Sequence, residues 1–159
     1  MIKKLFILML LLLSTVAGVF PLVRISLTNA QWDPILDRSG VLGLPGSTLS
    51  TSITSPPDVV SVRIFTDTGW NLTVERQDLN WSSELLLELR VSSTDNTFNR
   101  VGSTFTPGFL TIPTNPVQFA TGPAMRNGTL GIQYQISNIN AFTGAGQHTT
   151  TIIYTVTAN

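Results

Sequence analysis

The chain has 159 residues, with nine Lys and Arg against nine Asp and Glu, 42% hydrophobic residues and no cysteine. This length is enough for one domain with its own core, and the lack of cysteine excludes a disulfide framework and all thiol chemistry. Charged residues make up only 11% of the chain, so the sequence offers no basic stripe for a phosphate backbone, and we expect no nucleic-acid partner.

The first twenty residues have the pattern of a secretory signal peptide. Lys3 and Lys4 precede an apolar run from Leu5 to Leu13, and small residues follow it. A membrane-spanning helix needs about 20 apolar residues, and this run is shorter. We therefore expect a cleaved leader, with an uncleaved membrane anchor as the alternative, and a secreted, extracellular or cell-surface protein with no membrane span after cleavage.

Two cleavage positions fit this pattern. Thr15-Val16-Ala17 and Thr28-Asn29-Ala30 both place small residues where a signal peptidase inspects the chain. We expect the first, which makes 1–17 the signal peptide and 18–159 a single domain, and the cut site stays open between 17 and 30.

An apolar stripe lies at the start of the expected mature chain. A terminal segment that frays is usually polar, and proline belongs on an edge strand or near a strand start. The segment therefore pairs either with a neighbouring subunit, as an added strand, or within its own domain as a first strand. The residues that share this face are Val19, Pro21, Val23, Ile25 and Leu27.

Short alternating strands fill the rest of the chain. Turn signals recur about every 8 to 12 residues, as in sandwiches and barrels of short strands. Apolar residues alternate in 60–64, 72–74, 130–136 and 152–156, and a period of two places each set on one face of a strand. We predict an all-β fold, a single antiparallel β-sandwich of about seven to nine strands.

Residues 82–90 fit two structures. Ser82 and Ser83 are good helix caps, and Glu and Leu favour a helix. As a strand, the segment directs Leu85, Leu87, Leu89 and Val91 inward. We prefer the strand, because an all-β neighbourhood usually overrides local propensity.

The last alternating run predicts a long C-terminal strand that completes the sandwich. Its inward-facing residues are Ile152, Tyr154 and Val156, which we expect to be buried.

No residue pattern indicates catalysis. His148 is the only histidine, and we expect it to be an exposed turn residue rather than a general base. Glu84 and Glu88 are the most suggestive acid pair, but four residues of a strand span about 13 Å, beyond the separation that glycosidases use. We expect no enzyme.

No metal or cofactor is expected either. Asp33 with Asp37, and Asp95 with Asn96, offer oxygens to a hard cation, but these residues also form ordinary turns.

The three tryptophans have different expected roles. Trp70 shares a face with Leu72 and Val74, so we expect it in the core. Trp32 and Trp81 offer rings on which sugars stack, and Trp81, beside a turn, is the stronger candidate for a glycan contact. Three sequons leave glycosylation open; they begin at Asn71, Asn80 and Asn127.

Two segments resemble small exported bacterial β-sandwich proteins. Trp70-Asn71-Leu72-Thr73-Val74 and the glycine turn and Thr-rich strand of 144–157 are similar to the two ends of WxL-domain surface proteins, and the later segment also resembles spore-coat and pilus subunits. The second Trp-x-Leu is replaced here by Tyr154-Thr155-Val156. The resemblance implies a surface-attached or polymerising protein without catalysis.

Two functions fit these observations. The first is a non-catalytic structural or adhesive surface protein that associates with itself or with other surface proteins, as a subunit of a pilus, fimbria or surface layer assembled by β-strand exchange. The second is a module that binds cell-wall polysaccharide.

Overall fold

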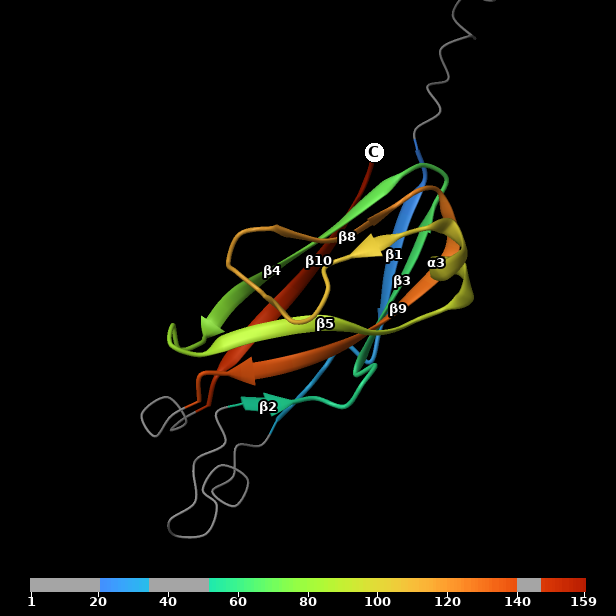
Figure 1. The fold of residues 1–159 in the computed structure, drawn as a ribbon. Coiled ribbons are helices and arrows are strands. Elements are labelled where there is room, and N and C mark those ends of the chain that lie inside the picture. Colours follow the sequence, from blue (N-terminus) through green and yellow to red (C-terminus); the bar gives the residue numbers. More distant parts are fainter. Residues whose placement is uncertain (1–20, 35–51, 140–146) are drawn as a thin grey trace, which may run out of the picture.

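The computed structural model describes residues 21–34, 52–139 and 147–159. They form two antiparallel sheets packed face to face (Figure 1). Strands make up 61% of the structure and helix 4%. This content and the two sheets confirm the predicted all-β sandwich. The described residues contain ten strands, slightly more than expected, because three of the strands are only two or three residues long. The expected signal peptide lies outside the described residues.

The sheets have six and four strands. The larger sheet has the order β1 (Val23–Thr28), β3 (Val60–Thr66), β9 (Met125–Ser137), β5 (Leu86–Thr94) and β7 (Leu110–Thr111), and β2 (Ser52–Thr54) also pairs with β9. The smaller sheet has the order β10 (Thr149–Ala158), β4 (Trp70–Asn80), β8 (Val117–Gly122) and β6 (Thr104–Phe105). One short helix, α3 (Asn96–Val101), follows β5.

Alternate side chains of the strands form the core. Val60, Val62 and Ile64 of β3 are buried, and so are Leu72 and Val74 of β4, as the period of two predicts. Each fully buried aliphatic side chain contributes about 1.5–3 kcal/mol through the hydrophobic effect, so these faces supply most of the stability.

The structure confirms two further predictions, the strand near residues 82–90 and the core position of Trp70. Residues 86–94 are strand, and Leu85, Leu87 and Leu89 are buried while Val91 is half-buried, which confirms the preferred inward face. Trp70 is fully buried and packs edge-on against Phe98, with ring centroids 5.6 Å apart. It is a core residue, as expected.

A polar bridge on the larger sheet links the turn between β2 and β3 to β5. Asp58 has a positive φ of 55°, and its carboxylate accepts hydrogen bonds from Ser92 Oγ at 2.5 Å and Ser93 Oγ at 2.7 Å on β5. To reach them it passes over Gly131 of β9, where an added Cβ would overlap the carboxylate. Gly131 therefore makes room for a link that passes over β9 and joins the turn between β2 and β3 to β5.

Candidate functional site

The two longest unpaired edges of the sandwich lie on the same side. β1 ends the larger sheet and β10 ends the smaller one, and the two strands lie close together across the sandwich. The opposite ends of the sheets are β7 and β6, each only two residues long. We call the side formed by β1 and β10 the open side (Figure 1). It carries the main free backbone edges of the described residues.

The edge strand β10 lacks the usual features that prevent pairing with another chain. Its ten residues, TTTIIYTVTA, contain no charge, proline or glycine, and its register with β4 is regular after Thr150. Natural edge strands are usually protected by charges, prolines, bulges or short length. β10 is therefore a template for an added strand.

The hydrogen-bond pattern shows which β10 residues present their backbone to an added strand. Asn159 N donates to Gly69 O at 2.8 Å, so Ala158 and Trp70, which are paired in register, form a non-hydrogen-bonded pair. In the regular register from Thr150 onward, the N–H and C=O groups of alternate residues then point away from β4. These outward residues include Ile152, Tyr154 and Val156, in the middle of the strand.

The same three side chains face the core but are only half-buried. The long C-terminal strand is confirmed, whereas the predicted burial of these side chains is wrong. Among the described residues no strand lies on the outer side of β10 to cover them.

β1 occupies most of the apolar stripe found in the sequence. It pairs antiparallel with β3 in the same chain, so the described chain uses this segment as its own first strand. Val23 and Ile25 are half-buried, whereas Pro21 and Leu27 are exposed. Val19 lies outside the described residues, and pairing of this stripe with a second subunit stays a prediction.

A cleft of about 1170 Å³ opens between the sheets on the open side. Core residues such as Leu87 and Ile136 line it. Trp32 also lines it and stacks on Tyr134, with ring centroids 5.9 Å apart and an interplanar angle of 16°. The cleft thus combines an apolar interior with aromatic side chains.

Two tyrosine hydroxyls bridge the sheets at this cleft. The hydroxyls of Tyr134 on β9 and Tyr154 on β10 are 2.6 Å apart. Burial raises the pKa of Tyr134 to about 12, although the hydrogen bond with Tyr154 opposes the shift. Burial, proximity to the charge of Tyr134 and the shared hydrogen bond raise the pKa of Tyr154 well above its usual value. Both phenols are therefore neutral at physiological pH.

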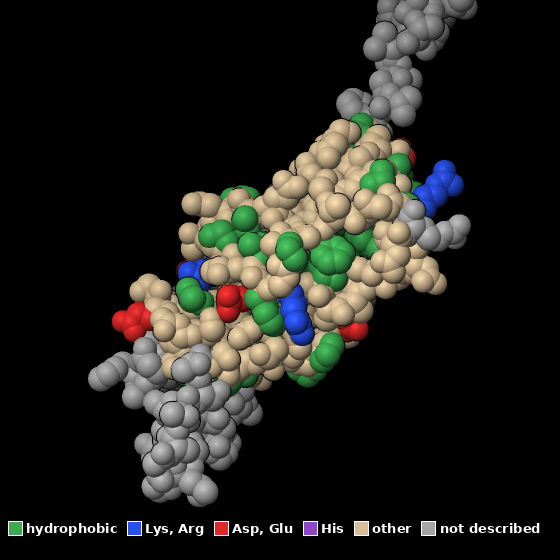
Figure 2. Space-filling model, in the orientation of Figure 1, with side chains coloured by type: hydrophobic (Ala, Val, Ile, Leu, Met, Phe, Trp, Pro, Cys, Tyr) green, Lys and Arg blue, Asp and Glu red, His purple; other side chains and the backbone are tan. Residues whose placement is uncertain are grey.

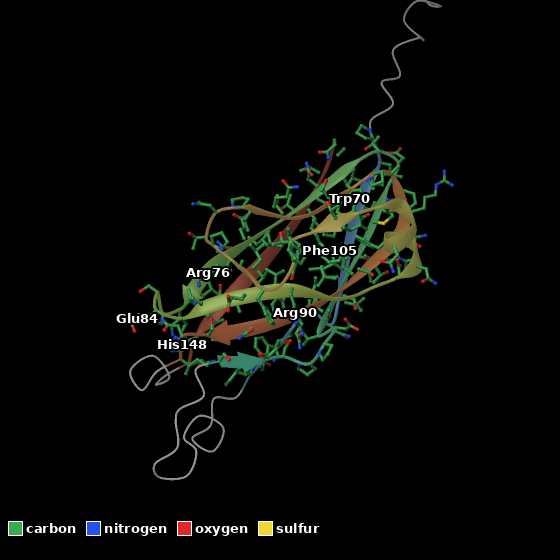
Figure 3. All side chains as sticks on the ribbon, viewed as in Figure 1. Trp70, Arg76, Glu84, Arg90, Phe105 and His148 are labelled. Atoms are coloured by element: carbon green, nitrogen blue, oxygen red, sulfur yellow. The ribbon has the colours of Figure 1, made fainter. Side chains whose placement is uncertain are left out.

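Trp81 lines the cleft, but its ring makes packing contacts. Its Nε1 donates to Leu85 O at 3.0 Å, the Arg76 guanidinium lies over the ring at 5.9 Å, and the His148 ring meets it at 6.3 Å. Its proposed role as a glycan contact stays a prediction. His148 is half-buried, not exposed as expected, because it packs against Trp81. Figure 3 labels His148, Arg76 and Glu84 toward the same end of the sandwich.

The acidic candidates make local hydrogen bonds. Glu88 accepts from Ser137 Oγ at 2.7 Å, Glu84 is exposed in the turn before β5, and Asp33 accepts from Gln31 Nε2 at 2.6 Å. Asp95 caps α3, with Asn96 as the first helical residue. Asp37 lies outside the described residues, and in the rest no group of His, Cys, Asp and Glu is arranged to hold a metal.

The three sequon asparagines differ in exposure. Asn80 and Asn127 are exposed, whereas Asn71 is half-buried and donates to Asn159 Oδ1 at 2.5 Å.

No family model, curated protein or solved structure matches the chain. Within the described ranges no helix is both long and apolar enough to span a membrane.

Proposed function

We propose that this chain is an exported, non-catalytic structural or adhesive protein of the cell surface, whose subunits associate by adding strands at the open side. The observation that carries the proposal is β10, a ten-residue edge strand without charge or proline. Each added backbone hydrogen bond contributes about 0.5–1.5 kcal/mol net, so a strand of this length offers a sizeable contact.

The chemistry of the mature chain favours non-covalent assembly. Cysteine is absent and both lysines, Lys3 and Lys4, lie in the expected leader. Neither disulfides nor bonds to lysine side chains then link the subunits. Backbone pairing at sheet edges needs no particular side chain.

A pair of lysine variants tests the proposal. Thr155 on β10 and Thr73 on β4 are directly paired in register and lie on the same outer face. Thr155→Lys places a charge on the edge strand, whereas Thr73→Lys adds the same charge one strand inward. Lysine on an edge blocks strand addition.

The measurement is sedimentation velocity of residues 18–159 over a range of concentrations. We expect concentration-dependent assembly for the native chain and the Thr73→Lys control, and a folded monomer for Thr155→Lys. Native protein that stays monomeric at every concentration, or equal assembly of both variants, would contradict strand addition at β10.

The cleft supports a second candidate, a polysaccharide-binding module. Aromatic rings stack on sugar rings, and Trp32 at the cleft is half-buried, so part of its ring is exposed. In this case folded monomer sediments with purified cell wall, and Trp32→Ala weakens that binding more than Trp81→Ala, whose ring is held by Arg76 and Leu85. No sedimentation with cell wall would exclude the candidate.

A further inference from the structure

Three arginines that are distant in sequence come together on the outer face of the larger sheet. Arg24 on β1 is paired with Phe65 on β3. Arg63 precedes Phe65 by two residues on the same face, and Arg126 lies in the β9 irregularity opposite Phe65. Adjacent strands lie about 4.8 Å apart and same-face residues about 6.8 Å apart, so these three residues, the arginine patch, surround Phe65.

The arginine patch has no carboxylate partner in the described part of the chain. All three arginines are exposed, and the ion pair found there joins Arg76 to Asp78 on the other sheet, at 3.5 Å. Asp67 and Asp95 adjoin the patch, but their carboxylates accept hydrogen bonds from backbone amides. The positive charges of the patch therefore face solvent.

The clustering is notable because charge is scarce in this chain. It has only nine Lys and Arg in all, and the surface in Figure 2 is mostly uncharged. Like charges on neighbouring strands repel, and solubility alone does not require them to be neighbours. An external partner of opposite charge offsets this repulsion.

We propose that the arginine patch binds an acidic polysaccharide, whose carboxylate or phosphate groups recur along an extended chain. Guanidinium groups bind both anions with paired hydrogen bonds, and the sheet face presents them side by side rather than in a pocket for one ion. Ser26 and Thr129, paired with Arg63 in register, add hydroxyls for sugar groups. The proposal rests on the adhesive function above and names the surface to which the protein adheres.

A polysaccharide fits this face better than a nucleic acid. Proteins that bind nucleic acids through their backbone typically make about 6–10 phosphate contacts, and the patch supplies three arginines. The carboxylates of Asp67 and Asp95 beside it weaken the field further.

The test measures binding of residues 18–159 to immobilised polygalacturonate, which carries carboxylates, and poly(glycerol phosphate), with neutral dextran as the control. We expect salt-sensitive binding to at least one polyanion, which identifies the anion, and none to dextran. Each single Arg→Gln substitution in the patch lowers affinity roughly threefold and the triple substitution roughly thirtyfold, as for exposed charge pairs.

Arg90→Gln is the matched control. Arg90, labelled in Figure 3, lies on the same sheet face. Its Nε donates to Gln133 Oε1 at 2.8 Å, and its guanidinium lies 4.8 Å from the Phe109 ring. Its substitution should leave polyanion binding unchanged.

Three results would overturn the proposal: no binding to either polyanion at low salt, equal losses for Arg90→Gln and the patch variants, or tighter binding to single-stranded DNA than to both polyanions. Sedimentation of the same samples reports strand addition at β10 separately, so failure of the patch and failure of the proposed assembly are distinguishable.

Discussion

Tyr134 and Tyr154 link the two sheets through one hydrogen bond at the rim of the cleft. The raised pKa of each group means that the folded state keeps its protons at pH values where the unfolded chain loses them. This contribution is complete below pH 10, the usual tyrosine pKa, and decreases as the pH rises toward the folded pKa of Tyr134, about 12.

We predict that the free energy of unfolding falls between pH 10 and about 12. The chain has two tyrosines, so tyrosinate absorbance follows this pair alone, and urea unfolding at each pH gives the stability. In a double Tyr134→Phe, Tyr154→Phe variant, the free energy of unfolding should change much less over the same pH range. If both phenols titrate near pH 10 in the folded protein, the bridge is not buried.

Gly131 has a steric role at the same scale. Gly131→Ala places a Cβ against the Asp58 carboxylate and breaks its hydrogen bonds to Ser92 and Ser93, at a cost of about 1–3 kcal/mol. Asp58→Ala removes the same bonds without a clash. Chemical denaturation of both single variants and the double variant is the measurement. We expect the double variant to lose less stability than the sum of the two single losses, because Ser93 Oγ, which the new Cβ also meets, is free to rotate once Asp58 is gone. Additive losses would contradict the proposed overlap.

At the scale of elements, the sequence predicts faces better than neighbours. The period of two correctly identifies the inward faces of β3, β9 and residues 85–89, because that period depends on the pleat alone. It does not show that β10 is an edge strand, so burial of Ile152, Tyr154 and Val156 was overestimated. Strand order depends on packing between distant segments, as in β4 and β10, whose paired residues Leu72 and Val156 are far apart in sequence.

The candidate sites were predictable to a smaller extent. Trp32, Trp81 and the stripe of β1 are visible in the sequence, since their residue types are distinctive. The arginine patch is not, because Arg24, Arg63 and Arg126 come from three strands and become neighbours only through the register of the sheet. The three shortest strands also escape prediction, since two or three residues show no period.

The edge strand should respond differently on its two faces. Val156→Asp places a charge on the half-buried core face of β10 and should cost roughly 2–3 kcal/mol. Thr155→Asp, on the exposed outer face, should cost less than about 0.5 kcal/mol. Thermal unfolding of dilute monomer measures both. Equal midpoints for the two variants would show that β10 contributes little to the sandwich.

At the scale of the whole molecule, the proposed surface role requires export. We predict that intact-mass analysis of protein recovered outside the cytoplasm finds a chain without residues 1–17. Recovery of a soluble cytoplasmic protein that retains Met1 and Lys3 would contradict both the expected export and the proposed surface role.

Hydrogen exchange of backbone amides is the most direct measurement of strand addition at β10, and it needs no substitution. In dilute protein the amides of Ile152, Tyr154 and Val156 face away from β4, so they should exchange fast, whereas those of Ile153 and Thr155 are protected by β4. At concentrations where the protein assembles, the first three should become protected as well. Assembly that leaves these three amides in fast exchange would contradict pairing at this edge.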